Sequence, residues 1–116
     1  MPVQSPEIIV EKQLAAYNRG DVDEFAACYS DDVEIWRDGM LVLRGLPALR
    51  EQYSTLFRKH PALSAIVAQR LVGRSLVVDE ELVTGRGEGP ELRAIAVFRV
   101  KFGRIRQAWF HTDEAE

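Results

Sequence analysis

A charged pair, Arg37-Asp38, ends the alternation of apolar and polar residues in EIWRDGMLVLRG and stands directly before Gly39. A carboxylate at the mouth of a pocket is a candidate general acid or base, because apolar surroundings raise its pKa toward neutrality. The same Asp38 would serve equally well as the polar corner of a turn, in which Gly39 supplies the tight bend. Whether Arg37 or Asp38 faces a pocket therefore decides if this segment takes part in catalysis.

Other kinds of site find little support in the sequence. The two histidines and the single cysteine, Cys28, lie far apart and lack chelating spacing with a carboxylate, so neither a metal site nor a cofactor is expected. The glycines of GRGEGP, residues 85–90, lie between two predicted strands, which indicates a hairpin loop and not a phosphate-binding loop. No Gly-x-Ser-x-Gly nucleophile motif occurs. Cofactor-independent chemistry or simple binding is left.

Length and composition indicate one globular domain. A chain of 116 residues can bury one hydrophobic core, so residues 1–116 are expected to form a single domain. The net charge of -3 lacks the basic excess that nucleic-acid binding requires. No secretory leader and no apolar stretch of about 18 residues is present, so we expect a cytoplasmic protein that does not enter a membrane.

Capping residues and hydrophobic spacing predict two helices at the start of the chain. Ser5 and Pro6 are suited to begin the first helix, and Gly20 is suited to end it. Asp21, with Glu24 three residues later, forms the capping pair of a second, short helix.

After these helices the hydrophobic period changes from helical to alternating and back. The pattern predicts strands over 33–38 and 40–45, a third helix over 46–60, and four strands over 63–72, 75–85, 91–102 and 104–112. The order ααββαββββ is typical of an α+β domain in which a curved sheet, antiparallel or mixed, wraps around the helices. The concave face of this sheet should be apolar.

The strand predicted over 91–102 has one uniformly apolar face, from Leu92 to Phe102 at every second residue, which should line the inside of the sheet. Its other face is charged at both ends and apolar only at Ile95 and Val97. An apolar spot on an otherwise polar face is what a contact between two sheets would leave.

The turn VKFGRI sets the register of the last two strands. A three-residue loop needs a positive φ only at Gly103, whereas a two-residue loop also needs one at Phe102, so the longer loop is favoured. That register places Trp109 outside, opposite Ile95, and turns His111 outward beside Arg93. Ile95, Val97 and Trp109 then predict a homodimer through the outer face of the sheet.

Three segments, QLAAYNRGDVDEFAACYSDDVEIW, GLPALREQYSTLF and FRVKFGRIRQAWF, resemble the nuclear transport factor 2-like superfamily, and within it the SnoaL-like and ketosteroid-isomerase-like branch. The resemblance covers nearly the whole chain. It implies a cone-shaped fold with an apolar pocket for a small molecule between the helices and the concave sheet. Members include isomerases, dehydratases, hydrolases and non-catalytic binding or interaction domains, so the fold alone does not give the activity.

The resemblance argues against steroid isomerase chemistry. The position of the isomerase's tyrosine is Gln13 here, and that of its oxyanion-hole aspartate is Ala96. Ungapped counting places Arg37 at the position of the catalytic base, with Asp38 one residue beyond. A one-residue slip in the turn would return Asp38 to that position.

The same resemblance turns Asp79 and Glu81 toward the pocket. Two acids in an apolar cavity either keep raised pKa values or meet a cation such as Arg37, and they could instead form ion pairs at an open rim. The candidate catalytic residues are therefore Asp38 and Glu81. The candidate pocket residues, several of which could equally be core, are Gln13, Tyr17, Arg37, Tyr53, Phe57, Asp79, Phe98 and Phe110.

Overall fold

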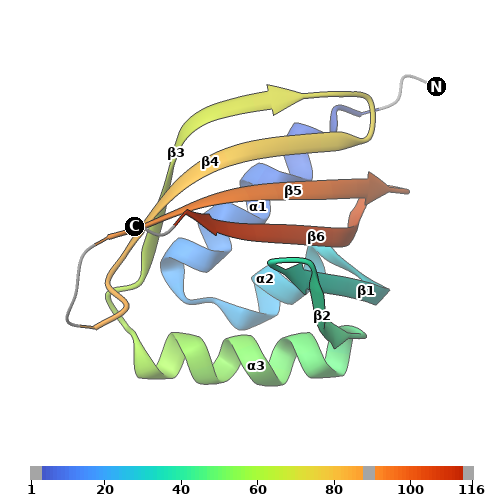
Figure 1. Cartoon of the computed structure of the whole chain (residues 1–116). Helices are drawn as coiled ribbons and strands as arrows, with labels where there is room; N and C mark the ends of the chain where they lie inside the picture. The colour runs from blue at the N-terminus through green and yellow to red at the C-terminus, as the bar shows by residue number, and fades with distance from the viewer. Residues whose placement is uncertain (1–3, 88–90, 114–116) are drawn as a thin grey trace.

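Residues 4–87 and 91–113 are described by the structure, which is a computed structural model. They form helices and strands in the predicted order ααββαββββ. None of the helices in these residues combines the length and the apolar character that crossing a bilayer would need. Residues 88–90 of the predicted GRGEGP loop lie outside the described residues. The elements (Figure 1) are α1 (Pro6–Arg19), α2 (Val22–Ala27), β1 (Tyr29–Arg37), β2 (Met40–Arg44), α3 (Leu46–Lys59), β3 (Ser64–Val72), β4 (Leu76–Thr84), β5 (Leu92–Lys101) and β6 (Arg104–Asp113).

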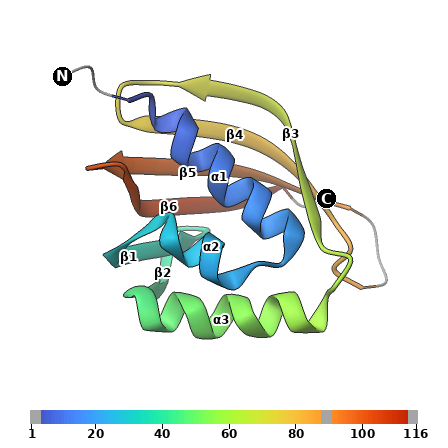
Figure 2. The ribbon, with the colours of Figure 1, turned by 180° about the vertical axis from the view of Figure 1, so that it is seen from behind.

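The strands form one mixed sheet in the order β2-β1-β6-β5-β4-β3. Strands β1 and β6 are parallel, and the other neighbours are antiparallel. The sheet is curved (Figures 1 and 2). Helix α1 packs against the part of the sheet that contains β4, β5 and β6, and α3 packs beside β1 and β2. The helices therefore cover the concave side of the sheet, in the predicted α+β architecture.

The first two helices begin where their capping residues predict, and the first also ends at its predicted glycine. The Ser5 hydroxyl accepts a hydrogen bond from the backbone N–H of Glu7, and the Asp21 carboxylate accepts one of 3.1 Å from the N–H of Glu24. Gly20 ends α1 with a φ of 67°, a left-handed conformation that glycine adopts without a steric penalty. The short connection through Gly20 brings α2 back against α1.

Asn18, near the end of α1, fastens this helix to the edge of the sheet. Its side-chain amide donates to the carbonyl of Ala65 at 3.0 Å, and its side-chain oxygen accepts from the N–H of Ala65 at 2.7 Å. Ala65 lies on β3, the last strand of the sheet order β2-β1-β6-β5-β4-β3. The paired bonds therefore hold the C-terminal end of α1 at the outer edge of the sheet.

Alternation along β4 and β5 separates an inward from an outward face. Asp79 and Glu81 are buried on the inward side of β4, together with the neighbouring valines. On β5 the alanines and Phe98 are buried, whereas Ile95 is 37% exposed, as the pattern predicts. Phe102, which was expected to continue the inward set, is fully exposed, because β5 ends at Lys101 and Phe102 belongs to the turn.

The predicted register of the last hairpin is wrong. Phe102 and Gly103 form a two-residue loop with φ values of 53° and 76°, and Lys101 pairs with Arg104. A bulge between Arg99 and Val100 absorbs one residue, so Trp109 lies opposite Val97 and not opposite Ile95. The positive φ at Phe102 keeps its local steric cost, and the fully exposed side chain meets no neighbour that would add to it. His111 is exposed, as expected, but its cross-strand partner is Ile95 and not Arg93.

Replacing Phe102 by Asn is expected to raise the free energy of unfolding by about 0.5–1 kcal/mol, because Asn adopts positive φ at a lower cost than a bulky aromatic residue. Urea unfolding followed by circular dichroism measures the change. Phe102→Ala is the control: it removes the same exposed ring but keeps the unfavourable backbone conformation, so it should leave stability nearly unchanged. Equal gains for both variants would attribute the effect to the ring and not to the backbone.

Candidate functional site

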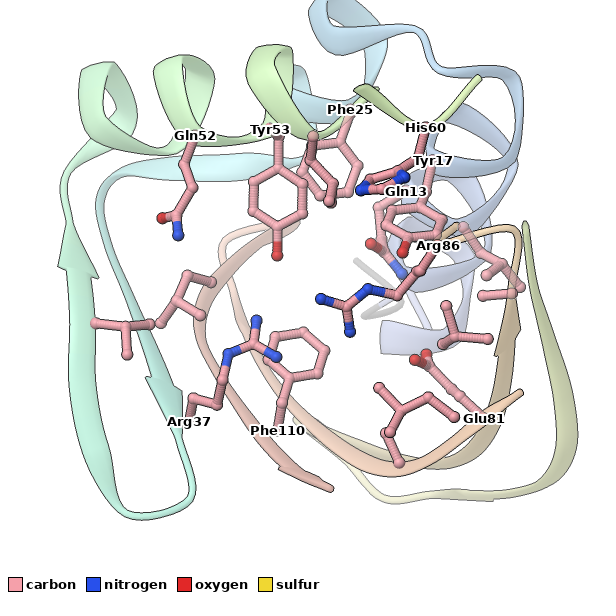
Figure 3. A pocket seen from close by; sticks show the side chains of 18 of the residues that line it. Gln13, Tyr17, Phe25, Arg37, Gln52, Tyr53, His60, Glu81, Arg86 and Phe110 are labelled. Atoms are coloured by element: carbon pink, nitrogen blue, oxygen red, sulfur yellow. The ribbon is translucent and has the colours of Figure 1, made fainter. Parts of the chain in front are cut away.

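A cavity of about 430 Å³ lies between the helices and the concave face of the sheet. Its walls combine aromatic and aliphatic side chains with a small number of polar groups, as in most small-molecule sites. Figure 3 shows these polar groups converging on the cavity from α1, β1, α3, β4 and the segment after β4. The most prominent of them are Gln13, Tyr17, Arg37, Tyr53, Glu81 and Arg86.

Arg37 lines this cavity, whereas Asp38 does not. Asp38 has a φ of 49° and forms the corner of the β1–β2 turn with Gly39. Its carboxylate accepts hydrogen bonds from the N–H and the hydroxyl of Thr112, at 3.1 and 3.2 Å. The chain turns immediately after Arg37, so the alternation of β1 directs Arg37 inward and commits Asp38 to the turn. Asp38 is therefore a turn residue at the rim, and its candidacy as a base is not supported.

The Arg37 guanidinium lies at the edge of the aromatic wall. Its central carbon is 5.7 Å from the centre of the Phe110 ring, a distance typical of a cation–π contact. Phe110 packs edge to face on Phe98, with ring centres 5.9 Å apart. Both rings line the cavity, and Arg37 is exposed, so its side chain lies between the aromatic wall and solvent.

Phe57 does not line the cavity, although the sequence made it a candidate. Its ring packs edge to face on Tyr17 and on Phe25, with centre distances of 5.6 Å in both cases. Phe57 is therefore a buried core residue whose ring packs against the ring of Tyr17.

Asp79 is a structural ion-pair residue and not part of the cavity wall. It is 1% exposed, and both of its carboxylate oxygens accept from the Arg70 guanidinium, at 2.7 and 2.9 Å. Arg70 lies directly opposite Asp79 on β3 and also pairs with Glu7 and Glu11 of α1. The sequence left two alternatives open for Asp79, a cation in the cavity such as Arg37 and an ion pair elsewhere. The cross-strand position of Arg70 satisfies the buried charge of Asp79 instead, because a buried carboxylate needs a close, hydrogen-bonded cation.

Glu81 is the carboxylate that faces the cavity. It is 7% exposed, and within the described residues no side chain or backbone group bonds to its carboxylate. Burial, followed by the negative charge of Asp79, raises the pKa of Glu81 to about 7, against the opposing effect of Arg70. Protonated and ionised forms therefore coexist near neutral pH, which is the requirement for a general acid–base residue.

Two phenols face the same space as Glu81. The hydroxyls of Tyr17 and Tyr53 point into the cavity (Figure 3). Burial raises the pKa of each of these tyrosines above its usual value, so both remain neutral hydrogen-bond donors. A third phenol, Tyr29, donates to the side-chain oxygen of Gln13 at 3.0 Å. This hydrogen bond fixes the orientation of the Gln13 side-chain amide.

The SnoaL-like domain model matches residues 10–108, which is most of the chain and includes the cavity-lining residues up to Phe98. The chain belongs to the SnoaL-like family. No curated protein sequence matches it significantly. Across residues 4–87 and 91–113 of this SnoaL-like protein, no three His, Cys, Asp or Glu side chains are grouped as a metal ion would require.

Solved structures confirm the fold. A cystatin-fold protein from Novosphingobium aromaticivorans is 22% identical, with a TM-score of 0.84 over 93% of this chain and 98% of the other. A SnoaL-like protein from Burkholderia thailandensis is 19% identical, with a TM-score of 0.80 over 94% of each chain. An LEH-like epoxide hydrolase from M. tuberculosis is 20% identical, with a TM-score of 0.79 over 93% of this chain and 82% of the other. These likenesses establish the nuclear transport factor 2-like, cystatin-like fold.

Sequence reasoning missed Arg70, Arg86 and Tyr29 in this SnoaL-like protein. The spacing of Tyr29 from Val22, Phe25 and Ala26 predicts that it continues the apolar face of the second helix, but Tyr29 begins β1, because α2 ends at Ala27. Arg86 lies in a glycine-rich segment whose pattern indicates a loop, and a loop pattern does not predict where a side chain points. Arg70 alone left a usable signal: pairing β3 with β4 as a hairpin places it opposite Asp79.

Proposed function

We propose that this SnoaL-like protein binds a small, largely apolar molecule in its cavity and moves a proton on it with Glu81. The reaction class is cofactor-independent isomerisation, dehydration or hydrolysis. One observation carries the proposal: Glu81 is a buried carboxylate at the cavity wall, with a pKa of about 7 and no bonded partner among the described residues. A carboxylate with this pKa removes and returns protons at neutral pH without another group.

The phenols of Tyr17 and Tyr53 supply the second requirement of such a reaction. Proton removal next to a carbonyl, or attack on it, places negative charge on oxygen, which neutral donors in a low-dielectric cavity stabilise. Both tyrosines keep their protons because burial raises their pKa values. They would act in place of the tyrosine and aspartate of a steroid isomerase, whose positions are Gln13 and Ala96 here.

The elimination of 5-nitrobenzisoxazole tests this role with a neutral reagent. A base removes the proton on carbon, the N–O bond breaks, and a nitrile and a coloured phenolate form, so no further reactant is needed. We expect the protein-catalysed rate to rise with pH through about 7, because the ionised form of Glu81 is the base. Glu81→Gln should lower that rate at least about tenfold.

Asp38→Asn is the matched control, since it neutralises a carboxylate that does not itself line the cavity. Its rate should equal that of the unmodified protein. An equal rate for Glu81→Gln would remove the basis for catalysis and leave the second candidate, a ligand-binding domain without turnover. One observation favours this second candidate: Gln13 and Ala96 replace the tyrosine and the oxyanion-hole aspartate of the isomerase.

We also propose that two copies associate through the outer face of the sheet. Strand register aligns outward apolar residues in one row across five strands, because Trp36 pairs with Trp109, Trp109 with Val97, Val97 with Val78, and Val78 with Leu71. Such a row, continuous across a sheet, is suited to a self-complementary contact about a two-fold axis. Ile95 lies beside the row and is 37% exposed.

Sedimentation equilibrium tests the association. The expected mass is about twice the 13.1 kDa of one chain, and Val97→Arg should return it to the monomer value, because an arginine in the centre of the row would be buried without a partner. Met40→Arg, at a 70% exposed position in the β1–β2 hairpin, is the control and should keep the dimer mass. A monomer mass for the unmodified protein would contradict the proposal.

A further inference from the structure

Positive charge is concentrated in the cavity of a protein that is negative as a whole. The chain carries a net charge of -3, yet among the residues that the structure describes the basic residues Arg37, Lys59, His60 and Arg86 line the cavity and Glu81 is the one acid in its wall. Because Glu81 is partly protonated near neutral pH, the cavity is positive under those conditions. This asymmetry attracts anions to the site.

Arg37 and Arg86 reach this space from opposite directions. Arg37 is the last residue of β1, and Arg86 follows β4, on the other side of the sheet. Figure 3 shows that both guanidinium groups point to the middle of the cavity. The Tyr53 hydroxyl points toward the same region. Both positive charges lower the pKa of Tyr17 and of Tyr53, against the effect of burial, as expected of cations that share one cavity with them.

Neither guanidinium is neutralised by the protein in the part of the chain that the structure describes. The ion pairs in residues 4–87 and 91–113 involve Arg44, Arg50, Arg70, Arg93 and Arg106. Arg37 contacts the face of Phe110, which leaves its N–H donors available to a ligand. Two planar, permanently charged groups with available donors form a receptor for the oxygens of an anion.

We propose that the molecule handled at Glu81 carries an anionic oxygen group, such as a carboxylate, which Arg37 and Arg86 bind together. Its apolar body then lies against Phe98 and Phe110, and its reacting atom faces Glu81. This inference rests on the proposed function for the reacting end of the molecule. The anion is held by the arginines and not by Glu81, so the base remains available to exchange a proton.

A pair of fluorescent probes separates charge from apolar fit. 1-Anilinonaphthalene-8-sulfonate and N-phenyl-1-naphthylamine share the same ring system, and only the first carries an anionic group. We expect the sulfonate to bind at least about tenfold more tightly. Arg37→Gln and Arg86→Gln should each weaken the sulfonate about tenfold and change the affinity of the neutral amine less than about twofold, because each removes a charge-assisted hydrogen bond.

Arg99→Gln is the matched control. It removes a cation that lies over an aromatic ring, 6.0 Å from the centre of Trp109, but on the outer face of the sheet. It should leave both affinities unchanged. The inference is overturned if the unmodified protein binds both probes equally, if it binds neither, or if the two glutamine variants weaken both probes alike.

The two proposals fail separately. 5-Nitrobenzisoxazole is neutral, so its elimination at Glu81 does not require Arg37 or Arg86, and a rate that depends on Glu81 would stand if the probes showed no preference for charge. A tenfold preference for the sulfonate, with no effect of Glu81→Gln on elimination, would support an anion-binding cavity without proton transfer.

Discussion

Glu81→Gln is expected to raise the free energy of unfolding by about 2–3 kcal/mol at pH 8 and by less than about 1 kcal/mol at pH 5. The pKa of Glu81 is about 7 in the folded protein and 4.5 for an unperturbed glutamate, so the folded state holds the proton more tightly. The contribution of Glu81 to stability is therefore fully present below pH 4.5 and is lost as pH rises through about 7. Glutamine keeps the shape of the side chain and carries no charge at any pH.

Denaturant unfolding at several pH values, compared between the two proteins, measures this difference. The comparison cancels the groups that titrate in both proteins. Glu80→Gln is the control on the same strand: Glu80 faces outward and pairs with Arg93 at 3.1 Å. It should show no gain at pH 8. Parallel stability curves for Glu81→Gln and the unmodified protein would show that the pKa of Glu81 is not raised.

Arg70→Met is expected to lower the free energy of unfolding by about 3–5 kcal/mol, because it leaves the carboxylate of Asp79 buried without its cation. Methionine keeps much of the length and apolar volume of the arginine stem, so the loss reports the charge and its hydrogen bonds. Urea unfolding at pH 7 measures it. The loss should shrink toward low pH, where protonation neutralises the stranded carboxylate.

Two further variants make this prediction specific. Arg70→Met combined with Asp79→Leu removes both partners, and it should recover most of the lost stability because no buried charge remains. Arg50→Met breaks the exposed pair with Asp23 and should cost less than about 1 kcal/mol. If Arg70→Met cost no more than Arg50→Met, the burial of the Asp79 ion pair would contribute nothing to the fold.

These two results are linked through β4. Asp79 and Glu81 lie two residues apart on the same face, and the charge of Asp79 is the second cause of the raised pKa of Glu81. Arg70 pairs with Asp79 in the core and lowers the pKa of Glu81 by less than Asp79 raises it. The ion pair thus maintains the electrostatic setting in which Glu81 titrates near neutrality.

Features that depend on neighbours in the sequence were predictable. The capping bonds of Ser5 and Asp21 act over two and three residues, so the starts of α1 and α2 follow from local residue types. The alternation of β5 sorts its residues by face, because successive side chains of a strand point to opposite sides. Element order and fold class follow from such periods, and together with the family resemblance they predict a cavity with Glu81 inside.

Features that depend on residues distant in the chain were not predictable from the sequence. The two-residue loop at Phe102 is compensated by a bulge at Val100, and β-bulges have no reliable mark in one sequence. Two residues far from Asp79 along α1, Glu7 and Glu11, complete the set around Arg70 only when α1 crosses the sheet. A difference of one residue in a turn exchanges the faces of a strand.

The different positions of Arg37 and Asp38 follow from this dependence of side-chain direction on the turn. Local sequence shows that this charged pair precedes a glycine turn, and it leaves open which member faces the cavity. The packing of β1 beside β6 resolves it, since Arg37 pairs with Phe110 in the parallel ladder and the Asp38 carboxylate bonds to Thr112. Side-chain type states what a residue is able to do, and long-range packing determines where it does it.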